Sequence, residues 1–137
     1  MSAFTITGAS QPTRSSIQSL FYFLSDFKNF GAILPEDKID NFQYAGDQCS
    51  FNIKGITPMT IKLVEKKPFE FLLFSSDGLA KFNFDLKVVF SGSPDLPGQC
   101  SIFLSGNLNP FIKAMAEKPL KGLVDTMSLK LSQLELA

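Results

Sequence analysis

Few side chains in this sequence are suited to chemistry. The chain contains no histidine, which excludes the usual serine and cysteine triads and the commonest zinc sites. A general acid–base pair needs two titratable groups that converge in a dry cleft. The acidic residues instead fall mainly in expected turns or on outward faces: Asp47, Asp77, Asp85, Asp95, Glu117, Asp125 and Glu135. We therefore assign no catalytic residue and no metal ligand.

Two cysteines, Cys49 and Cys100, are the remaining candidates. Both occupy inward positions of expected strands, where a cysteine usually behaves as a small hydrophobic residue. A reactive thiolate needs a nearby cation or a helix N-terminus, and the sequence places neither beside them. Two cysteines are also too few for a disulfide framework. We expect two reduced, buried thiols.

The elements that would position any site follow from the apolar residues, which recur with a period of two through the middle of the chain. Phe82, Phe84, Leu86, Val88 and Phe90 fall on one face of an expected strand, with polar residues between most of them. Similar alternation and regularly spaced turn signals predict a meander of six antiparallel strands. We expect these strands at 39–44, 48–54, 59–63, 69–76, 80–90 and 99–108, and one further short strand at 4–7.

Helical spacing occurs on both sides of this meander. Pro12 suits the first turn of a helix, and a second short helix is expected at 27–30. The first helix has a buried stripe formed by Ile17, Leu20, Phe21 and Leu24. After the meander, Asn109 and Pro110 provide a cap and a first turn. The apolar stripe of this last helix continues toward the C-terminus through Ile112, Ala116, Pro119, Leu123, Met127, Leu131 and Leu134.

Pro119 interrupts the pattern of the closing helix. A proline in a helix interior removes one hydrogen bond and costs about 3 kcal/mol. Either the helix kinks there, or it stops near Glu117 and restarts with Pro119 in its first turn. Gly122 is also a weak helix former. The sequence therefore predicts the weakest point of the helix at this position.

Length, composition and charge bound the remaining possibilities. A chain of 137 residues is long enough for one domain with a substantial core, and we take residues 1–137 as a single domain. The formal net charge is zero, so nucleic acid is not expected as a main partner. No signal peptide and no apolar run of the roughly 20 residues needed for a membrane span is seen. We expect a cytoplasmic protein without a stable membrane anchor.

The order of elements, together with three short segments, resembles the START-like (SRPBCC) superfamily, in particular its small bacterial members. The segments are 20–27 (LFYFLSDF), 34–38 (LPEDK) and 108–111 (LNPF). This superfamily includes birch-pollen-allergen-like proteins, polyketide cyclases and lipid-transfer domains. The resemblance implies an α+β helix-grip fold, in which a curved antiparallel sheet of six to seven strands wraps a long C-terminal helix, and two short helices follow the first strand. It also implies an apolar tunnel for lipids, polyketides or other apolar molecules, but no particular ligand and no histidine-dependent chemistry.

The expected lining of such a cavity is the inward face of the meander and the stripe of the helix. Its members are Phe51, Ile53, Ile61, Leu63, Phe71, Leu73, Phe82, Phe84, Leu86, Ile102, Leu104, Met115, Leu123 and Met127. The alternative is that these side chains pack against each other at native density. Tyr44, Asn52 and Asn107 are the possible polar groups, although solvated or structural roles are favoured for all three.

Taken together, these patterns favour non-catalytic binding or carriage of a small apolar molecule, without a cofactor. A ligand that enters between helix and sheet is expected to pass the weak point at Pro119 and the flexible side chains of Met115 and Met127. Two alternatives stay open: an enzyme of the cyclase or dehydratase type, and a protein-interaction module that resembles chaperone regulators. The sequence gives neither the ligand nor the oligomeric state.

Overall fold

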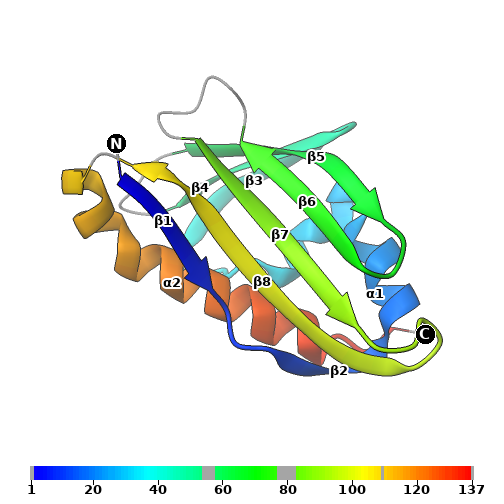
Figure 1. Ribbon diagram of the computed structural model, residues 1–137. Helices are drawn as coiled ribbons and strands as arrows, with labels where there is room; N and C mark the ends of the chain where they lie inside the picture. Colours follow the sequence, from blue (N-terminus) through cyan, green and yellow to red (C-terminus); the bar gives the residue numbers. More distant parts are fainter. Residues whose placement is uncertain (1, 54–57, 77–82, 109, 137) are drawn as a thin grey trace.

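The described residues form one eight-stranded antiparallel sheet and three helical segments (Figure 1). The structure, a computed structural model, describes residues 2–53, 58–76, 83–108 and 110–136. The strands follow the order β1-β8-β7-β6-β5-β4-β3, and β2 also pairs with β8. Their bounds are β1 Ser2–Thr7, β2 Gln11–Ser16, β3 Ile39–Ala45, β4 Gln48–Ile53, β5 Pro58–Lys67, β6 Phe71–Ser76, β7 Asn83–Ser91 and β8 Pro97–Leu108.

The predicted alternation in β7 is confirmed. Phe84, Leu86, Val88 and Phe90 are buried, whereas the residues between them are exposed or half-buried. The register places Leu86 opposite Leu104 of β8 and Phe74 of β6, so the inward residues of neighbouring strands meet on one face of the sheet. Phe82, which the sequence assigned to the same face, lies outside the described residues.

The expected helix that begins at Pro12 is wrong in its first turn, because residues 11–16 form strand β2, which pairs with β8. Inward positions of β2 are polar. Thr13 Oγ1 donates to the Ser15 carbonyl at 2.9 Å and accepts from the Gly98 N–H at 2.8 Å. Ser15 Oγ donates to the Leu134 carbonyl at 2.6 Å. Buried hydroxyls with such partners hold the strand in place without an apolar pattern.

Helix α1 (Ile17–Leu24) begins where β2 ends. The Ser16 side chain caps it by accepting from the Ser19 N–H at 3.2 Å. The predicted stripe of Ile17, Leu20, Phe21 and Leu24 is buried. A 3-10 helix, η1 (Phe27–Ile33), follows with Asp26 as its cap, in the place of the second short helix that the sequence predicted.

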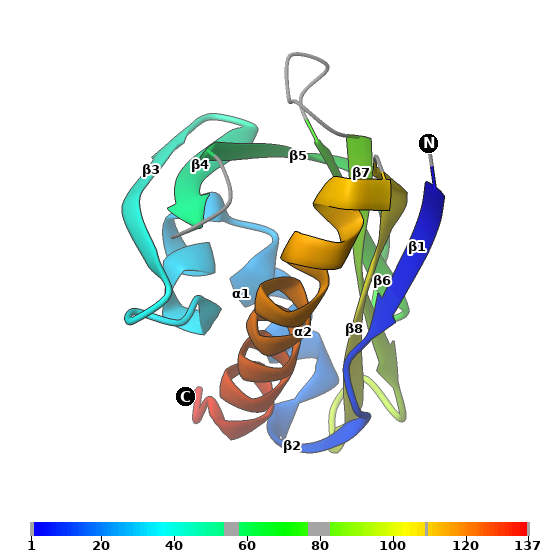
Figure 2. The same ribbon diagram turned by 90° about the vertical axis from the view of Figure 1, so that its left-hand side faces the viewer.

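The long helix α2 (Pro110–Gln133) lies across one face of the sheet, against β8, β2 and β1, and also contacts η1 (Figures 1 and 2). Pro119 lies inside it, so the helix does not end near Glu117 and restart. Two lysines tie α2 to its neighbours. Lys121 Nζ donates to the Thr7 carbonyl at 2.7 Å, and Lys130 Nζ donates to the Leu34 carbonyl at 2.8 Å.

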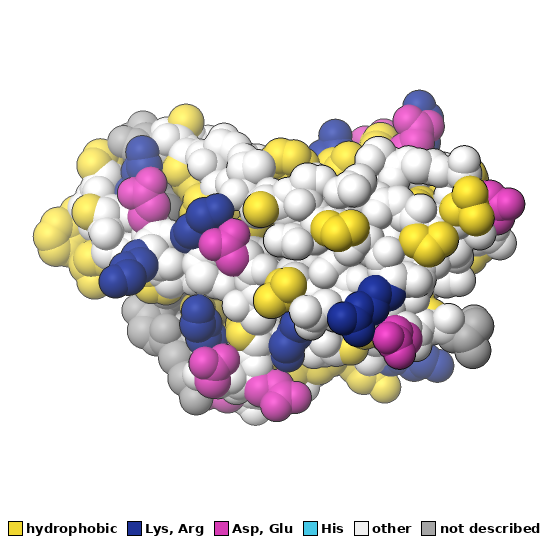
Figure 3. All heavy atoms as spheres, turned by 90° about the horizontal axis from the view of Figure 1, so that it is seen from below, with side chains coloured by type: hydrophobic (Ala, Val, Ile, Leu, Met, Phe, Trp, Pro, Cys, Tyr) yellow, Lys and Arg dark blue, Asp and Glu magenta, His cyan; other side chains and the backbone are white. Residues whose placement is uncertain are grey.

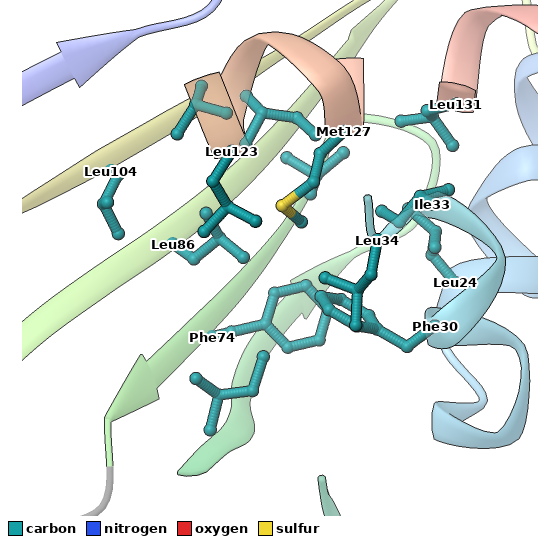
Figure 4. Packing of buried hydrophobic residues seen from close by; sticks show 14 of the residues in the cluster. Leu24, Phe30, Ile33, Leu34, Phe74, Leu86, Leu104, Leu123, Met127 and Leu131 are labelled. Carbon is teal, nitrogen blue, oxygen red and sulfur yellow. The ribbon is translucent and has the colours of Figure 1, made fainter. Parts of the chain in front are cut away.

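Aromatic rings fill the space between η1 and the sheet. Phe74 of β6 lies 5.7 Å from Phe27 and 5.3 Å from Phe30, measured between ring centroids, in edge-to-face geometry. Figure 4 shows Leu123 directed from α2 toward Leu86, and Met127 directed toward the rings of Phe74 and Phe30. Phe30, Phe74 and Met127 are fully buried. The space between α2, η1 and β6 is therefore filled by side chains.

The passage from β1 to β2 brings the chain very close to α2 at Gly8. The Gly8 N–H donates to the Ile102 carbonyl at 2.8 Å. A β-carbon at this position would lie 2.5 Å from Ser128 Oγ, so no larger residue fits without movement. Ser128 is buried, and its hydroxyl has no hydrogen-bond partner among the described residues.

The other edge of the sheet is β3, whose ladder with β4 is irregular. The register shifts between Asp40 and Gln43, and Asn41 has a φ of 61°. Asparagine adopts this left-handed conformation more readily than most residues. The result is a bulge in the edge strand. Among the described residues, no helix is both long and apolar enough to span a membrane.

Candidate functional site

An open groove of about 570 Å³ runs beside the middle of α2. One wall is formed by residues 118–125 of α2, and the other by Asp37 and Lys38, which connect η1 to β3, and by Ile53 at the end of β4. In Figure 2, α2 is seen between β8 and β1 on one side and η1, β3 and β4 on the other. The groove therefore lies on the side of α2 that the β1–β8 half of the sheet does not cover.

The floor of the groove is apolar. Ile53 and Leu123 line it and are 4% and 3% exposed, and half-buried Pro119 lies beside them. Because Pro119 has no N–H, the carbonyl of Met115 loses its usual partner four residues later in the helix. The point where the sequence predicted a weak helix is thus the point where the groove is found.

The rim of the groove is charged. Lys121 Nζ pairs with Asp125 Oδ1 at 3.0 Å on the same helix. Across the groove, the Lys38 side chain lies against the helix backbone, because a β-carbon added at Gly122 would be 2.6 Å from Lys38 Nζ. Both lysines and Asp125 are exposed. Charged and apolar lining is therefore separated into a solvated rim and a drier floor.

Most of the predicted lining residues do face the interior. Two of them, Ile53 and Leu123, line the groove itself, and Leu63 is only partly buried against the core. The buried members of the predicted set are Phe51, Ile53, Ile61, Phe84, Leu86, Ile102, Leu104, Leu123 and Met127. Apart from Ile53 and Leu123 at the groove and Phe84 at a second hollow, the structure brings these side chains together as packed core.

Three predicted lining residues are corrected by the structure. In β6 the buried residues are Leu72 and Phe74, so Phe71 and Leu73 lie on the opposite, half-exposed face. The Phe71 ring lies there 4.5 Å from the Lys87 ammonium. Met115 is 63% exposed, because it lies on the outer side of α2, and it does not line the groove.

The three possible polar groups also lie away from the groove. Tyr44 is 55% exposed, and the Asn52 side chain donates to Asp40 Oδ1 at 3.1 Å on the neighbouring strand. Asn107 borders a different hollow of about 460 Å³, near the ends of β1, β7 and β8. The Asp85 carboxylate in that hollow accepts from Ser75 Oγ at 2.6 Å. Structural or solvated positions were favoured for Tyr44, Asn52 and Asn107, and the structure gives them such positions.

Sequence reasoning missed the charged residues of the groove. The sequence analysis gives Lys118 and Lys121 no role in the site, and Asp37 and Lys38 enter it only as part of the segment 34–38 that carries the family resemblance. The signal that could have located the groove is the pair Pro119 and Gly122, which marked the right segment of α2. Its opposite wall comes from residues about 80 positions earlier, and no local pattern links the two segments.

The cysteines are inward, as predicted. Cys49 and Cys100 are buried and unpaired. Burial raises the pKa of Cys49 to about 12 and the pKa of Cys100 to about 11. Both thiols therefore stay protonated at neutral pH. Within the described parts of the chain, no three Cys, Asp or Glu side chains are grouped in a way that could hold a metal ion.

Comparison with solved structures places this architecture in a known fold. A START superfamily protein from Mycobacterium smegmatis has a TM-score of 0.59 at 12% identity, over 90% of this chain and 98% of that one. Norcoclaurine synthase from Thalictrum flavum, in complex with a transition state analogue, has a TM-score of 0.59 at 12% identity over 96% of both chains. A protein from Mesorhizobium loti has a TM-score of 0.66 at 12% identity over 94% of both chains. No protein-family model and no curated protein sequence matches the chain.

These comparisons establish the fold. The chain has the START-like, α+β helix-grip fold, with an antiparallel sheet around a long C-terminal helix. The resemblance noted in the sequence is thereby confirmed at the level of structure. At such low identities the likeness carries the fold and not the ligand.

Proposed function

We propose that the protein binds or carries a small apolar molecule in the groove beside α2. The observation that carries this proposal is the open hollow of about 570 Å³ with Ile53, Pro119 and Leu123 in its lining. Ligand sites typically measure roughly 300–1,000 Å³ and are mostly apolar, with a few placed polar groups. The groove has a volume in this range, an apolar floor and a few charged side chains at its rim.

The position of the ionisable groups supports binding more than catalysis. Norcoclaurine synthase is an enzyme with a similar structure, so a cyclase- or dehydratase-like reaction is the natural rival. Acid–base catalysis needs titratable groups that are held against the substrate in a water-poor site. Asp37 and Asp125, the carboxylates among the described residues that line this groove, are exposed at its rim.

A protein-interaction module is the second rival. It would use exposed apolar residues and a filled interior. Phe111 and Met115 are 74% and 63% exposed near the start of α2. In Figure 3, hydrophobic side chains gather at the left end, whereas basic and acidic side chains mix along the rest of this face. The open groove favours the small-molecule proposal over this one.

An apolar fluorescent probe tests the proposal. We expect phenylnaphthylamine, which carries no charge, to bind with micromolar affinity, about −8 kcal/mol. Leu123→Trp should abolish binding while the protein stays folded, because Leu123 also borders the groove, whose open space can accept the larger ring system. Leu129→Trp is the matched control, since Leu129 is 45% exposed on the same helix; it should leave binding unchanged.

The same variants supply the contrary outcome. Leu131 is fully buried in the packed part of the core, and Leu131→Trp should lower the free energy of unfolding by about 1–3 kcal/mol through overpacking. If Leu123→Trp is destabilising to the same degree and the native protein binds no probe, the groove is not a ligand site.

A further inference from the structure

The charges around the groove specify what kind of ligand it suits. Among the described residues, three lysines and two aspartates line it: Lys38, Lys118 and Lys121 against Asp37 and Asp125, a net charge of +1. The whole chain has a formal net charge of zero. The positive excess of the groove is therefore balanced by negative charge elsewhere in the chain.

The pairing of these groups leaves lysines available. Asp125 is taken up by Lys121, whose ammonium also donates to the Thr7 carbonyl at 2.7 Å. Neither Lys38 nor Lys118 has a side-chain hydrogen bond or ion pair within the part of the chain that the structure describes. Two ammonium groups thus stand at the rim without a carboxylate partner among the described residues.

The Lys38 side chain reaches from the η1–β3 connection to α2. Its ammonium occupies the space above Gly122, where a β-carbon would come within 2.6 Å of it. A methyl group at this position would push the flexible end of the Lys38 side chain aside, so glycine leaves room for the ammonium to lie on the helix. Gly122 weakens the helix by roughly 1 kcal/mol relative to alanine. In return, the absence of a side chain at Gly122 lets the Lys38 ammonium lie at the opening of the apolar groove.

We infer, resting on the proposed function, that the ligand is an amphiphile with a single negative charge. Its apolar part lies on Ile53, Pro119 and Leu123, and its anionic head, a carboxylate or a sulfate-like group, meets the Lys38 and Lys118 ammonium groups. An anion there is favoured because the rim already carries a net positive charge. A cationic head is repelled by these lysines, and a neutral head gains at most a hydrogen bond from them.

Two probes with the same rings separate the charge from the apolar contact. Anilinonaphthalene sulfonate carries a sulfonate that phenylnaphthylamine lacks. Lys38→Met should weaken binding of the sulfonate about two- to fivefold, the range expected for an exposed ion pair, and leave binding of the neutral probe unchanged. Lys38→Arg should retain sulfonate binding. Lys66→Met is the matched control, since Lys66 is exposed on β5 outside the groove, and it should change neither affinity.

Gly122→Ala gives an independent readout. The added methyl displaces the Lys38 ammonium, so sulfonate binding should weaken although the helix itself becomes more stable. A merely structural role for Gly122 would leave the preference between the two probes unaltered. Dodecanoate should also displace the neutral probe at lower concentration than dodecyltrimethylammonium does.

The outcomes distinguish the inference from the function on which it rests. If the neutral probe binds but Lys38→Met and Gly122→Ala change both affinities equally or not at all, the anionic head group is refuted and the apolar site stands. If dodecyltrimethylammonium is the better competitor, the charge assignment is likewise refuted. If neither probe binds the native protein, the proposed function fails, and this inference fails with it.

Discussion

Two buried serines on α2 allow a sharp test of the packing at the β1–β2 junction. Ser128 and Ser132 are 1% and 4% exposed. Ser132 Oγ donates to the Leu129 carbonyl at 2.7 Å, whereas Ser128 Oγ has no partner among the described residues and faces Gly8. The same substitution to alanine should therefore have opposite effects at the two positions.

The magnitude follows from the hydroxyl groups. An unpaired buried hydroxyl costs about 1–3 kcal/mol, and alanine is favoured over serine in a helix by about 0.5 kcal/mol. Lost contacts of the removed oxygen offset part of this gain. We expect Ser128→Ala to raise the free energy of unfolding by about 1–2 kcal/mol, which corresponds to roughly 4–8 °C in Tm. Ser132→Ala loses a hydrogen bond worth about 1 kcal/mol and should lower the free energy of unfolding by about 0.5 kcal/mol after the helix term.

Urea unfolding followed by circular dichroism measures both variants, and an unchanged slope with denaturant shows that the change is one of stability. Gly8→Ala adds a second arm. Its β-carbon would lie 2.5 Å from Ser128 Oγ, so the single variant should have a free energy of unfolding lower by about 1–3 kcal/mol. The loss should be smaller when Gly8→Ala is combined with Ser128→Ala, because the clashing oxygen is then absent. The reasoning is refuted if Ser128→Ala lowers the stability as Ser132→Ala does, because the hydroxyl must then have a partner.

The remaining predictions concern the thiols and Pro119. Because burial raises the pKa of Cys49 to about 12 and that of Cys100 to about 11, both thiols should react slowly with a disulfide reagent in the native protein and quickly after denaturation; rapid native labelling would count against their burial. The raised pKa values also make the stability depend on pH, because the folded protein holds the two thiol protons more tightly than the unfolded chain. The stability is unaffected below the unfolded thiol pKa of about 8.5 and falls as the pH rises toward the folded pKa values. Urea midpoints measured at increasing pH would show this fall. Pro119→Ala restores an N–H to the middle of α2 and should raise the free energy of unfolding by up to about 3 kcal/mol; a lower urea midpoint would instead show that the proline ring is needed for packing.

The sequence predicted elements well where one face is apolar and the other polar. β7 and α1 follow their patterns because burial decides the phase of each residue. In β6 the run from Phe71 to Phe74 is apolar on both faces, so periodicity does not choose between them. The Phe71 ring is accommodated outside by Lys87, a residue of the next strand.

The errors at β2 and in the site have a different cause, which is that the deciding partners are distant in the chain. Thr13 and Ser15 are buried as polar groups because Gly98 and Leu134 supply their hydrogen-bond partners. The groove likewise needs Lys38 to meet Gly122. The sequence could mark the helix segment at Pro119, but not the residues that approach it from another part of the chain.

The bulge at Asn41 has a consequence for how copies of the protein meet. A straight edge strand offers its unpaired N–H and C=O groups as a template for a strand of another molecule. Because the register shifts between Asp40 and Gln43, a strand of another molecule could pair with β3 on only one side of the bulge at a time. The opposite border is broken at Gly8, where the chain passes from β1 to β2, and Pro12 in β2 lacks an N–H to offer. Both borders of the sheet are therefore interrupted as templates for a further strand, which suits a protein that, on our proposal, must stay dispersed while it holds an apolar ligand.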